Sequence, residues 1–215
     1  MKAPWKAMGL LLLSVVTIPA WATEIRLEKI RVSADLSALE RGAETVVTMC
    51  LGCHGLKYMK YRDLGKLGIA QDKVDALRAG QALDAPLLSQ MPADVALQSF
   101  GIVPPDLSLI AKARAGGASY VYSFLLGFHV NAQGIPDNRV FPGTKMPDIL
   151  GVSSADDAQR AELQGRALDA ASFLAWVADP RAEERRNMGK YVIAYLVVLT
   201  VLLYLVKRRV WARLK

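Results

Sequence analysis

Apolar residues recur three or four positions apart in several parts of this chain, which is the spacing of one helix face. The pattern predicts helices from about Asp35 towards the two cysteines, between Pro104-Pro105 and Gly116-Gly117, from Ser119 to Leu126, and from a capping box at Ser154 and Asp157 to Pro180. The stretches 80–106 and 131–153 are rich in Gly and Pro and are predicted to be loops. No stretch alternates as a strand does, so we expect an all-α fold.

The first 22 residues have the layout of a secretory signal peptide. Two lysines precede an apolar run from Ala7 to about Ile18, and small residues follow at Ala20 and Ala22. The alternative is an uncleaved anchor helix, but the run is short and ends in an A-x-A pattern. We therefore expect cleavage after Ala22 and export of the rest of the chain.

A second apolar run lies near the C-terminus and predicts a transmembrane helix over residues 187–206. Tyr191 to Val206 contains no charged residue, and Lys190 can extend its charge to the interface. A buried core helix would carry a polar stripe, which is missing here. Because the preceding body is exported, the helix stops translocation and leaves the basic tail 207–215 in the cytoplasm. Residues 23–186 are then a periplasmic domain.

The charge distribution argues against nucleic-acid binding. The chain has 27 Lys and Arg, 20 Asp and Glu, and a formal net charge of +7. The excess of basic residues lies at the two ends, beside the apolar runs, and the interior is neutral. Hydrophobic residues make up 53% of the chain, which excludes disorder as its main state, and 215 residues exclude a large multidomain enzyme.

The only two cysteines, Cys50 and Cys53, form C-x-x-C-H with His54, which is the attachment signature of c-type haem. Two thiols near one helix end can each bond a haem vinyl group, and the adjacent imidazole can reach the iron. A thioredoxin-like pair would follow a strand in a βαβ pattern, and a zinc site would need more Cys or His ligands. A disulfide closing so small a loop would stabilise little. We expect one haem c, held by two thioethers.

A second axial ligand has to come from elsewhere in the chain. Met146, Met91 and His129 are the candidates, and an open iron position is the remaining possibility. Met146 is favoured because Pro142, Gly143 and Pro147 restrict its loop, and such a loop can hold a thioether rigidly. Met49 and Met59 stand too close to the attachment site to reach the other face of the haem.

The sequence resembles the cytochrome c1 family, the membrane-anchored haem subunits of ubiquinol:cytochrome c oxidoreductase (bc1) complexes. Four blocks carry the resemblance, in family order: CLGCHGLKYMKYRDL, PPDLSLIAKARAGGASYVYSFLLGF, FPGTKMPD and FLAWVADPRAEERRNMGKYVIAYLVVLTVLLYLVKRRVW. The resemblance implies a cytochrome c-like haem domain with a single C-terminal transmembrane helix. It also implies that His54 and Met146 ligate the iron and that five further residues line the pocket: Pro104, Pro105, Arg114, Tyr120 and Phe141.

The resemblance implies a function in electron transport. The haem would take one electron from a Rieske iron–sulfur subunit and pass it to a periplasmic c-type cytochrome, beside a cytochrome b subunit in the bacterial inner membrane. Two alternatives remain open at this point. One is a free-standing anchored c-type cytochrome that feeds a terminal oxidase, and the other is a haem sensor with an open iron position.

Overall fold

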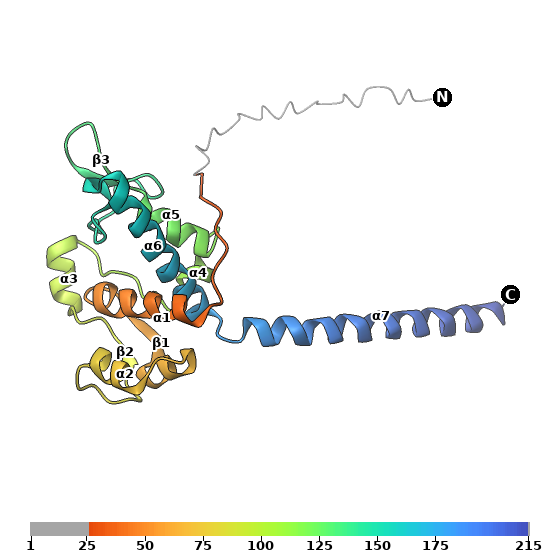
Figure 1. Cartoon of the computed structure of the whole chain (residues 1–215). Helices are drawn as coiled ribbons and strands as arrows, with labels where there is room; N and C mark the ends of the chain where they lie inside the picture. Colours follow the sequence, from red (N-terminus) through yellow and green to blue (C-terminus); the bar gives the residue numbers. More distant parts are fainter. Residues whose placement is uncertain (1–25, 215) are drawn as a thin grey trace, which may run out of the picture.

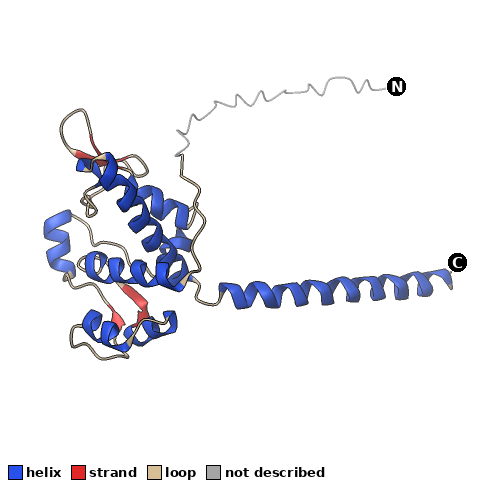
Figure 2. Ribbon diagram, viewed as in Figure 1, coloured by secondary structure: helices blue, strands red, loops and turns tan. Residues whose placement is uncertain are grey.

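Helices dominate the part of the chain that the computed structural model describes, residues 26–214, which confirms the predicted fold class (Figure 2). The helices are α1 (Leu36–Thr45), α2 (Gln71–Arg78), α3 (Ala93–Phe100), α4 (Ile110–Ala113), α5 (Ala118–Leu126), α6 (Asp157–Ala178) and α7 (Ala182–Ala212). A π-helical turn (Val46–Cys50) extends α1, and 3-10 turns cover Tyr61–Leu67 and Val152–Ser154. The predicted signal peptide lies outside the described residues.

Helices α1 and α6 pack across each other at the centre of the core (Figure 1). Gly42 of α1 lies at the crossing, where an added Cβ would stand 2.2 Å from the Asp169 carbonyl oxygen and 2.8 Å from the Cβ of Phe173. Phe173 is fully buried there. Beside it, Arg41 Nε donates to Asp169 Oδ2 at 2.7 Å. This close approach fixes the direction of α1, which leads straight to Cys50.

The first described residues form an extended segment that runs beside α5 (Figure 1) and also contacts α6. Three backbone N–H groups of this segment donate to serine hydroxyls on the two helices: Glu28 to Ser123 (2.8 Å), Ile30 to Ser119 (3.2 Å) and Ser33 to Ser172 (2.9 Å). Because side chains on the helices satisfy these donors, the segment needs no strand partner.

Two short antiparallel strand pairs connect the helices. Strand β1 (Leu56–Lys60) pairs with β2 (Pro86–Leu87), and β3 (Phe128–Val130) pairs with β4 (Pro136–Asn138). The sequence shows no alternating pattern of useful length, and these strands, of two to five residues, are too short to produce one. The second pair turns the chain back towards the end of α5, with Asn138 opposite Phe128.

The structure corrects three details of the sequence analysis. Helix α3 lies in the stretch predicted to be loop. Its eight residues, between Pro92 and Gly101, are too few for the apolar spacing to indicate a helix. After the proline pair only the four residues of α4 are helical, because the backbone before α4 bonds the haem-motif segment instead, with Leu107 N donating to Gly55 O at 2.7 Å.

The third correction concerns the start of α6. Asp156 caps this helix, whereas Ser154 lies in the preceding 3-10 turn. The Asp156 carboxylate accepts from Gln159 N at 2.8 Å, and the Gln159 side chain accepts from Asp156 N at 3.0 Å, which is a complete capping box. The predictions for α5 and for the end of α6 before Pro180 are confirmed.

Helix α7 extends as a single long rod away from the domain that contains C-x-x-C-H and ends with α6 (Figure 1). It contains the whole predicted span 187–206 and continues one turn or more beyond it on each side. None of its residues is buried, and it is long and apolar enough to cross a membrane. An apolar helix of this length with no buried residue is typical of a membrane anchor.

Candidate cofactor pocket

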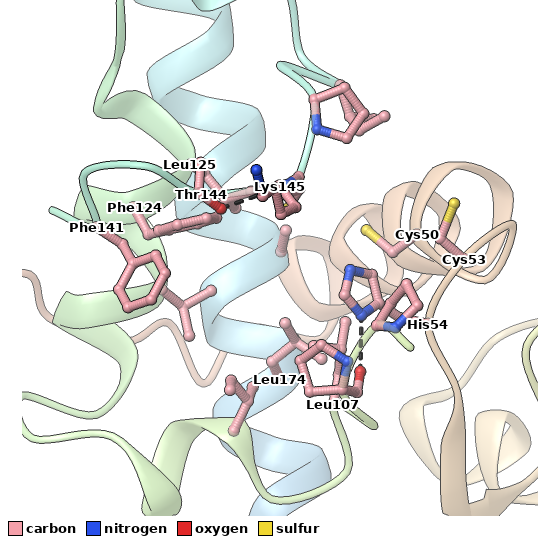
Figure 3. Close-up of a pocket in the computed structure, with 18 of the residues that line it drawn as sticks. Cys50, Cys53, His54, Leu107, Phe124, Leu125, Phe141, Thr144, Lys145 and Leu174 are labelled. Atoms are coloured by element: carbon pink, nitrogen blue, oxygen red, sulfur yellow. Dashed lines mark hydrogen bonds between the residues drawn. The ribbon is translucent and has the colours of Figure 1, made fainter. Parts of the chain in front are cut away.

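An apolar cavity of about 460 Å³ lies between the C-terminal end of α1, helices α5 and α6, and the loop that follows β4 (Figure 3). The volume is in the range of cofactor sites in proteins. All nine residues that the resemblance assigns to the haem or its pocket line it: Cys50, Cys53, His54, Pro104, Pro105, Arg114, Tyr120, Phe141 and Met146. Figure 3 shows the two thiols and His54 on one side, and Phe141, Thr144 and Lys145 on the other.

A tight turn at the end of α1 presents the two thiols and the imidazole together. The N–H groups of Cys53 and His54 both donate to the Cys50 carbonyl oxygen, at 3.1 and 2.8 Å. Both thiols are half-buried and they are not joined by a disulfide. Burial raises the pKa of the Cys50 thiol to about 11, and the neighbouring Cys53 adds to this shift. Cys50 therefore stands as a neutral thiol at the cavity wall.

His54 is held with one ring nitrogen free. Its Nδ1 lies 2.7 Å from the Pro105 carbonyl oxygen, so Nδ1 carries the hydrogen and donates it. Burial lowers the pKa of His54, and the Pro105 carbonyl and Asp106 oppose that shift only in part. The neutral ring with its hydrogen on Nδ1 keeps the lone pair on Nε2. A histidine that ligates a metal is typically fixed in this way by a carbonyl at its other nitrogen.

The carbonyl that orients His54 is itself fixed by the segment around Asp106. The Asp106 carboxylate accepts from Lys57 N at 2.9 Å and from Ser108 N at 3.0 Å, and the buried Ser108 hydroxyl accepts from Tyr58 N at 3.1 Å. Segments about 50 residues apart in the sequence are therefore joined directly beneath the imidazole. The sequence contains no signal for this arrangement, because the acceptor for His54 is a backbone carbonyl.

Met146 comes from the loop after β4 and lines the cavity as a half-buried side chain. Its backbone N–H donates to Thr144 Oγ1 at 3.3 Å, a bond drawn in Figure 3. Of the three candidates for a second axial ligand, only Met146 is among the cavity-lining residues. His129 lies on β3 opposite Asp137, with Nδ1 3.3 Å from the Gly127 carbonyl oxygen, and Met91 lies before α3.

Charged and aromatic side chains form the rim of the cavity. The Arg114 guanidinium lies 5.6 Å from the centre of the Tyr120 ring, within the range of a cation–π contact. Tyr120 stacks on Phe124, whose ring meets Phe128 edge to face. Phe141 is 49% exposed, so one wall of the cavity borders solvent. The rim therefore combines two cations, Arg114 and Lys145, with the exposed ring of Phe141.

The sequence analysis missed most of the apolar lining. These residues are Val46, Met49, Phe100, Ile102, Leu107, Ile110, Val121, Phe124, Leu125, Ile149, Ala170 and Leu174. Helical spacing marks several of them as inward-facing, but it does not tell a core position from a cavity wall. Met49, which stands too close to the cysteines to reach the other face of the haem, is one of these lining residues.

These residues fit a haem. Two thiols one helical turn apart, an imidazole with a free Nε2, a thioether and an apolar enclosure are the groups that a c-type haem requires. A bare metal ion fits less well, because no three His, Cys, Asp or Glu side chains gather in residues 26–214. The zinc alternative therefore lacks its ligands within this range.

Comparison with known proteins identifies the family. The model of the Cytochrome C1 family matches residues 25–214. Cytochrome c1 of Rhodospirillum rubrum is 30% identical over 84% of this chain and 83% of its own length. The ammonia monooxygenase gamma subunit of Nitrosomonas europaea is 29% identical, over 94% and 96%. A cytochrome b/c1 of Bradyrhizobium diazoefficiens is 31% identical over 83% of this chain and 33% of its own length. The chain therefore belongs to the cytochrome c1 family, whose members are haem-carrying electron-transfer subunits of the respiratory chain.

Proposed function

We propose that this chain carries single electrons from a Rieske iron–sulfur protein to a c-type cytochrome, through a haem bonded to Cys50 and Cys53 and ligated by His54 and Met146. The observation that carries the proposal is the hydrogen bond from His54 Nδ1 to the Pro105 carbonyl oxygen, 2.7 Å long, in a cavity that Met146 also lines. It supports a ligand role for His54 because it leaves Nε2 available. When bound, haem supplies an iron that accepts and donates one electron reversibly.

The two cysteines hold the cofactor in place. Cys50 and Cys53 would hold the haem through two thioethers, because addition of each S–H across one vinyl group would form the bond without loss of any atom. The α1 end keeps both thiols on one side through the two hydrogen bonds to the Cys50 carbonyl oxygen. Permanent attachment lets a small cavity, open at Phe141, retain its cofactor.

The axial residues and the residues at the cavity rim set the reduction potential of the haem. Methionine with histidine as axial ligands gives a higher potential than two histidines. The apolar walls also raise the potential, because a low dielectric disfavours the extra positive charge of the ferric form. Arg114, which contacts Tyr120 at the rim, would pair with a haem propionate, because a guanidinium can bond a carboxylate through two parallel N–H groups.

Helix α7 anchors the domain in the membrane beside its partners. The relative from Bradyrhizobium diazoefficiens carries cytochrome b and cytochrome c1 in its name, which supports a cytochrome b subunit as the neighbour of this chain. An anchor that confines two proteins to one bilayer raises their effective concentration. We place residues 23–186 on the periplasmic side of a bacterial inner membrane and the tail 207–215 in the cytoplasm, as the apolar segments at the two ends imply.

The ligand assignment is tested by replacing Met146 with leucine, which keeps the volume and removes the sulfur. We expect Met146→Leu to lower the reduction potential sharply and to let the reduced protein bind carbon monoxide, because the iron loses a ligand. The matched control is His129→Ala, which we expect to leave both properties as in the wild type. Carbon monoxide binding by His129→Ala together with a closed iron in Met146→Leu would transfer the ligand role to His129.

A further inference from the structure

The loop that carries Met146 has no regular secondary structure. Residues 139–149 lie between β4 and the 3-10 turn Val152–Ser154, and no helix or strand ladder fixes their backbone. An axial ligand has to be held to within a fraction of an ångström, which requires a supporting shell of side chains. We propose that Asp137 and Asn138 are that shell: positioning residues whose side chains fold the loop and hold Met146 at the cavity. The inference rests on the proposed ligand role of Met146.

Asn138 joins the beginning of the loop to helix α5. Its side chain is completely buried, and Nδ2 donates to the Phe124 carbonyl oxygen at 2.8 Å. Its Oδ1 accepts from the N–H groups of Val140 at 2.9 Å and Phe141 at 3.2 Å. Gly127 leaves room for this carboxamide, since an added Cβ there would lie 2.8 Å from Oδ1. Both polar atoms of the buried Asn138 side chain are thus hydrogen-bonded to backbone groups.

Asp137 holds the turn at the middle of the loop. Its Oδ1 accepts from Asn138 N and from Gly143 N, both at 2.8 Å. These two N–H groups, Gly143 first, lower the pKa of Asp137, so the side chain stays an ionised acceptor at neutral pH. Gly143 has φ +75° and follows Pro142, and Thr144 N donates to Phe141 O at 3.2 Å. Proline followed by a left-handed glycine is the pattern of a type II turn.

The chain of hydrogen bonds continues to the ligand. The Thr144 hydroxyl, placed by that turn, accepts from Met146 N at 3.3 Å. The contacts therefore run from the end of α5 through Asn138 and the 141–144 turn to Met146, and Asp137 closes the turn from the other side. Breaking one buried hydrogen bond of ordinary strength changes an opening equilibrium by roughly tenfold. Loss of the Asn138 or Asp137 side chain should therefore free the loop without removing any side chain that lines the cavity.

The test compares variants of the full-length, haem-loaded protein in detergent. Asn138→Leu keeps the size of the side chain and removes its three hydrogen bonds, and Asp137→Ala breaks the same loop at a less buried position. Asp137→Asn retains an acceptor oxygen and should restore the wild-type properties. Ser172→Ala is the matched control. Ser172, on α6, is buried, accepts a hydrogen bond from Ser33 N and does not line the cavity.

Carbon monoxide binding by the reduced protein, the reduction potential and amide hydrogen exchange of residues 139–149 are measured for each variant. We expect Asn138→Leu and Asp137→Ala, which each remove more than one hydrogen bond, to raise the carbon monoxide-bound fraction and loop exchange by at least about tenfold and to lower the potential, while Asp137→Asn and Ser172→Ala match the wild type. Should Asn138→Leu be too unstable to load haem, Asp137→Ala decides.

Met146→Leu separates the two possible failures. If Met146→Leu binds carbon monoxide while Asn138→Leu and Asp137→Ala stay closed with wild-type exchange, the positioning inference is wrong and the ligand assignment stands. If Met146→Leu also stays closed, the ligand assignment is wrong and the positioning role is lost with it. If Ser172→Ala opens the iron as much as Asn138→Leu does, general destabilisation explains the effect and the inference is overturned.

Discussion

Among single residues, Gly42 decides how closely α1 approaches α6. A methyl group at this position would overlap the Asp169 carbonyl oxygen, which belongs to helix backbone and has no room to move aside. We expect Gly42→Ala to destabilise the protein by about 3 kcal/mol, as overpacking of a tight helix contact does. The shift of the denaturation midpoint in guanidinium chloride measures the loss.

Gly165 on α6 provides the control for that substitution, because an added Cβ there meets no atom within 4 Å. Gly165→Ala should stabilise the protein by about 0.5–1 kcal/mol, since alanine loses less backbone entropy in a helix. Equal midpoints for Gly42→Ala and the wild type would contradict the close helix crossing.

How far the residues of the site could be foreseen depends on how local their signal is. Cys50, Cys53 and His54 form a motif in consecutive positions, so spacing alone marked them. The partner of His54 is a backbone carbonyl 51 residues away, and a carbonyl has no sequence signature. Asn138 looked like a loop residue, since asparagine is common in turns and nothing in its neighbourhood indicates burial.

At the scale of secondary-structure elements, Asp179 links the end of α6 to α4 and to the start of α7. Its carboxylate pairs with Arg185 at 2.7 Å and with Lys112 at 2.9 Å. These partners, Arg185 first, lower the pKa of Asp179 well below its usual value. A lowered pKa in the folded state means that the pairs stabilise the protein above pH about 4 and that this contribution is lost as the pH falls further.

Replacing Asp179 with asparagine removes both ion pairs at every pH. The variant should therefore have a lower thermal midpoint than the wild type at pH about 7, and the difference should shrink below pH about 4, where the Asp179 carboxylate is protonated in the unfolded state first and in the folded state only at still lower pH. Thermal unfolding in detergent across this range is the measurement. If the difference in thermal midpoint between the wild type and Asp179→Asn grew towards acid pH, the ion pairs of Asp179 would not be its cause.

The helices were foreseen in proportion to their length and pattern. Helix α5 and the long α6 show clear periodicity and proper ends, and their predictions are confirmed. The start of α6 was misplaced because Ser154 and Asp156 both precede an apolar helix and both have a capping partner three residues on; the structure selects Asp156 with Gln159. Helix α3 and the strand pairs are stabilised by tertiary contacts, and segments this short carry too little periodic pattern to be predicted from the sequence.

For the molecule as a whole, a haem domain on a single exposed anchor suits a subunit of a larger assembly. A relative of similar identity is named as a subunit of an ammonia monooxygenase, so the partner enzyme has to be established by experiment. We expect the chain to copurify in mild detergent with a b-type haem and an iron–sulfur signal, at constant ratio through a second column. A free-standing carrier would elute without either of them.

The proposed covalent bond between the haem and the two cysteines, Cys50 and Cys53, underlies the rest of the account. Acid–acetone extraction of the purified protein, followed by mass spectrometry of the peptide that contains Cys50 and Cys53, tests it most directly. We expect the colour to remain with the polypeptide and the peptide to carry the mass of one haem. Colour in the acetone phase, with two free thiols on the peptide, would contradict the account.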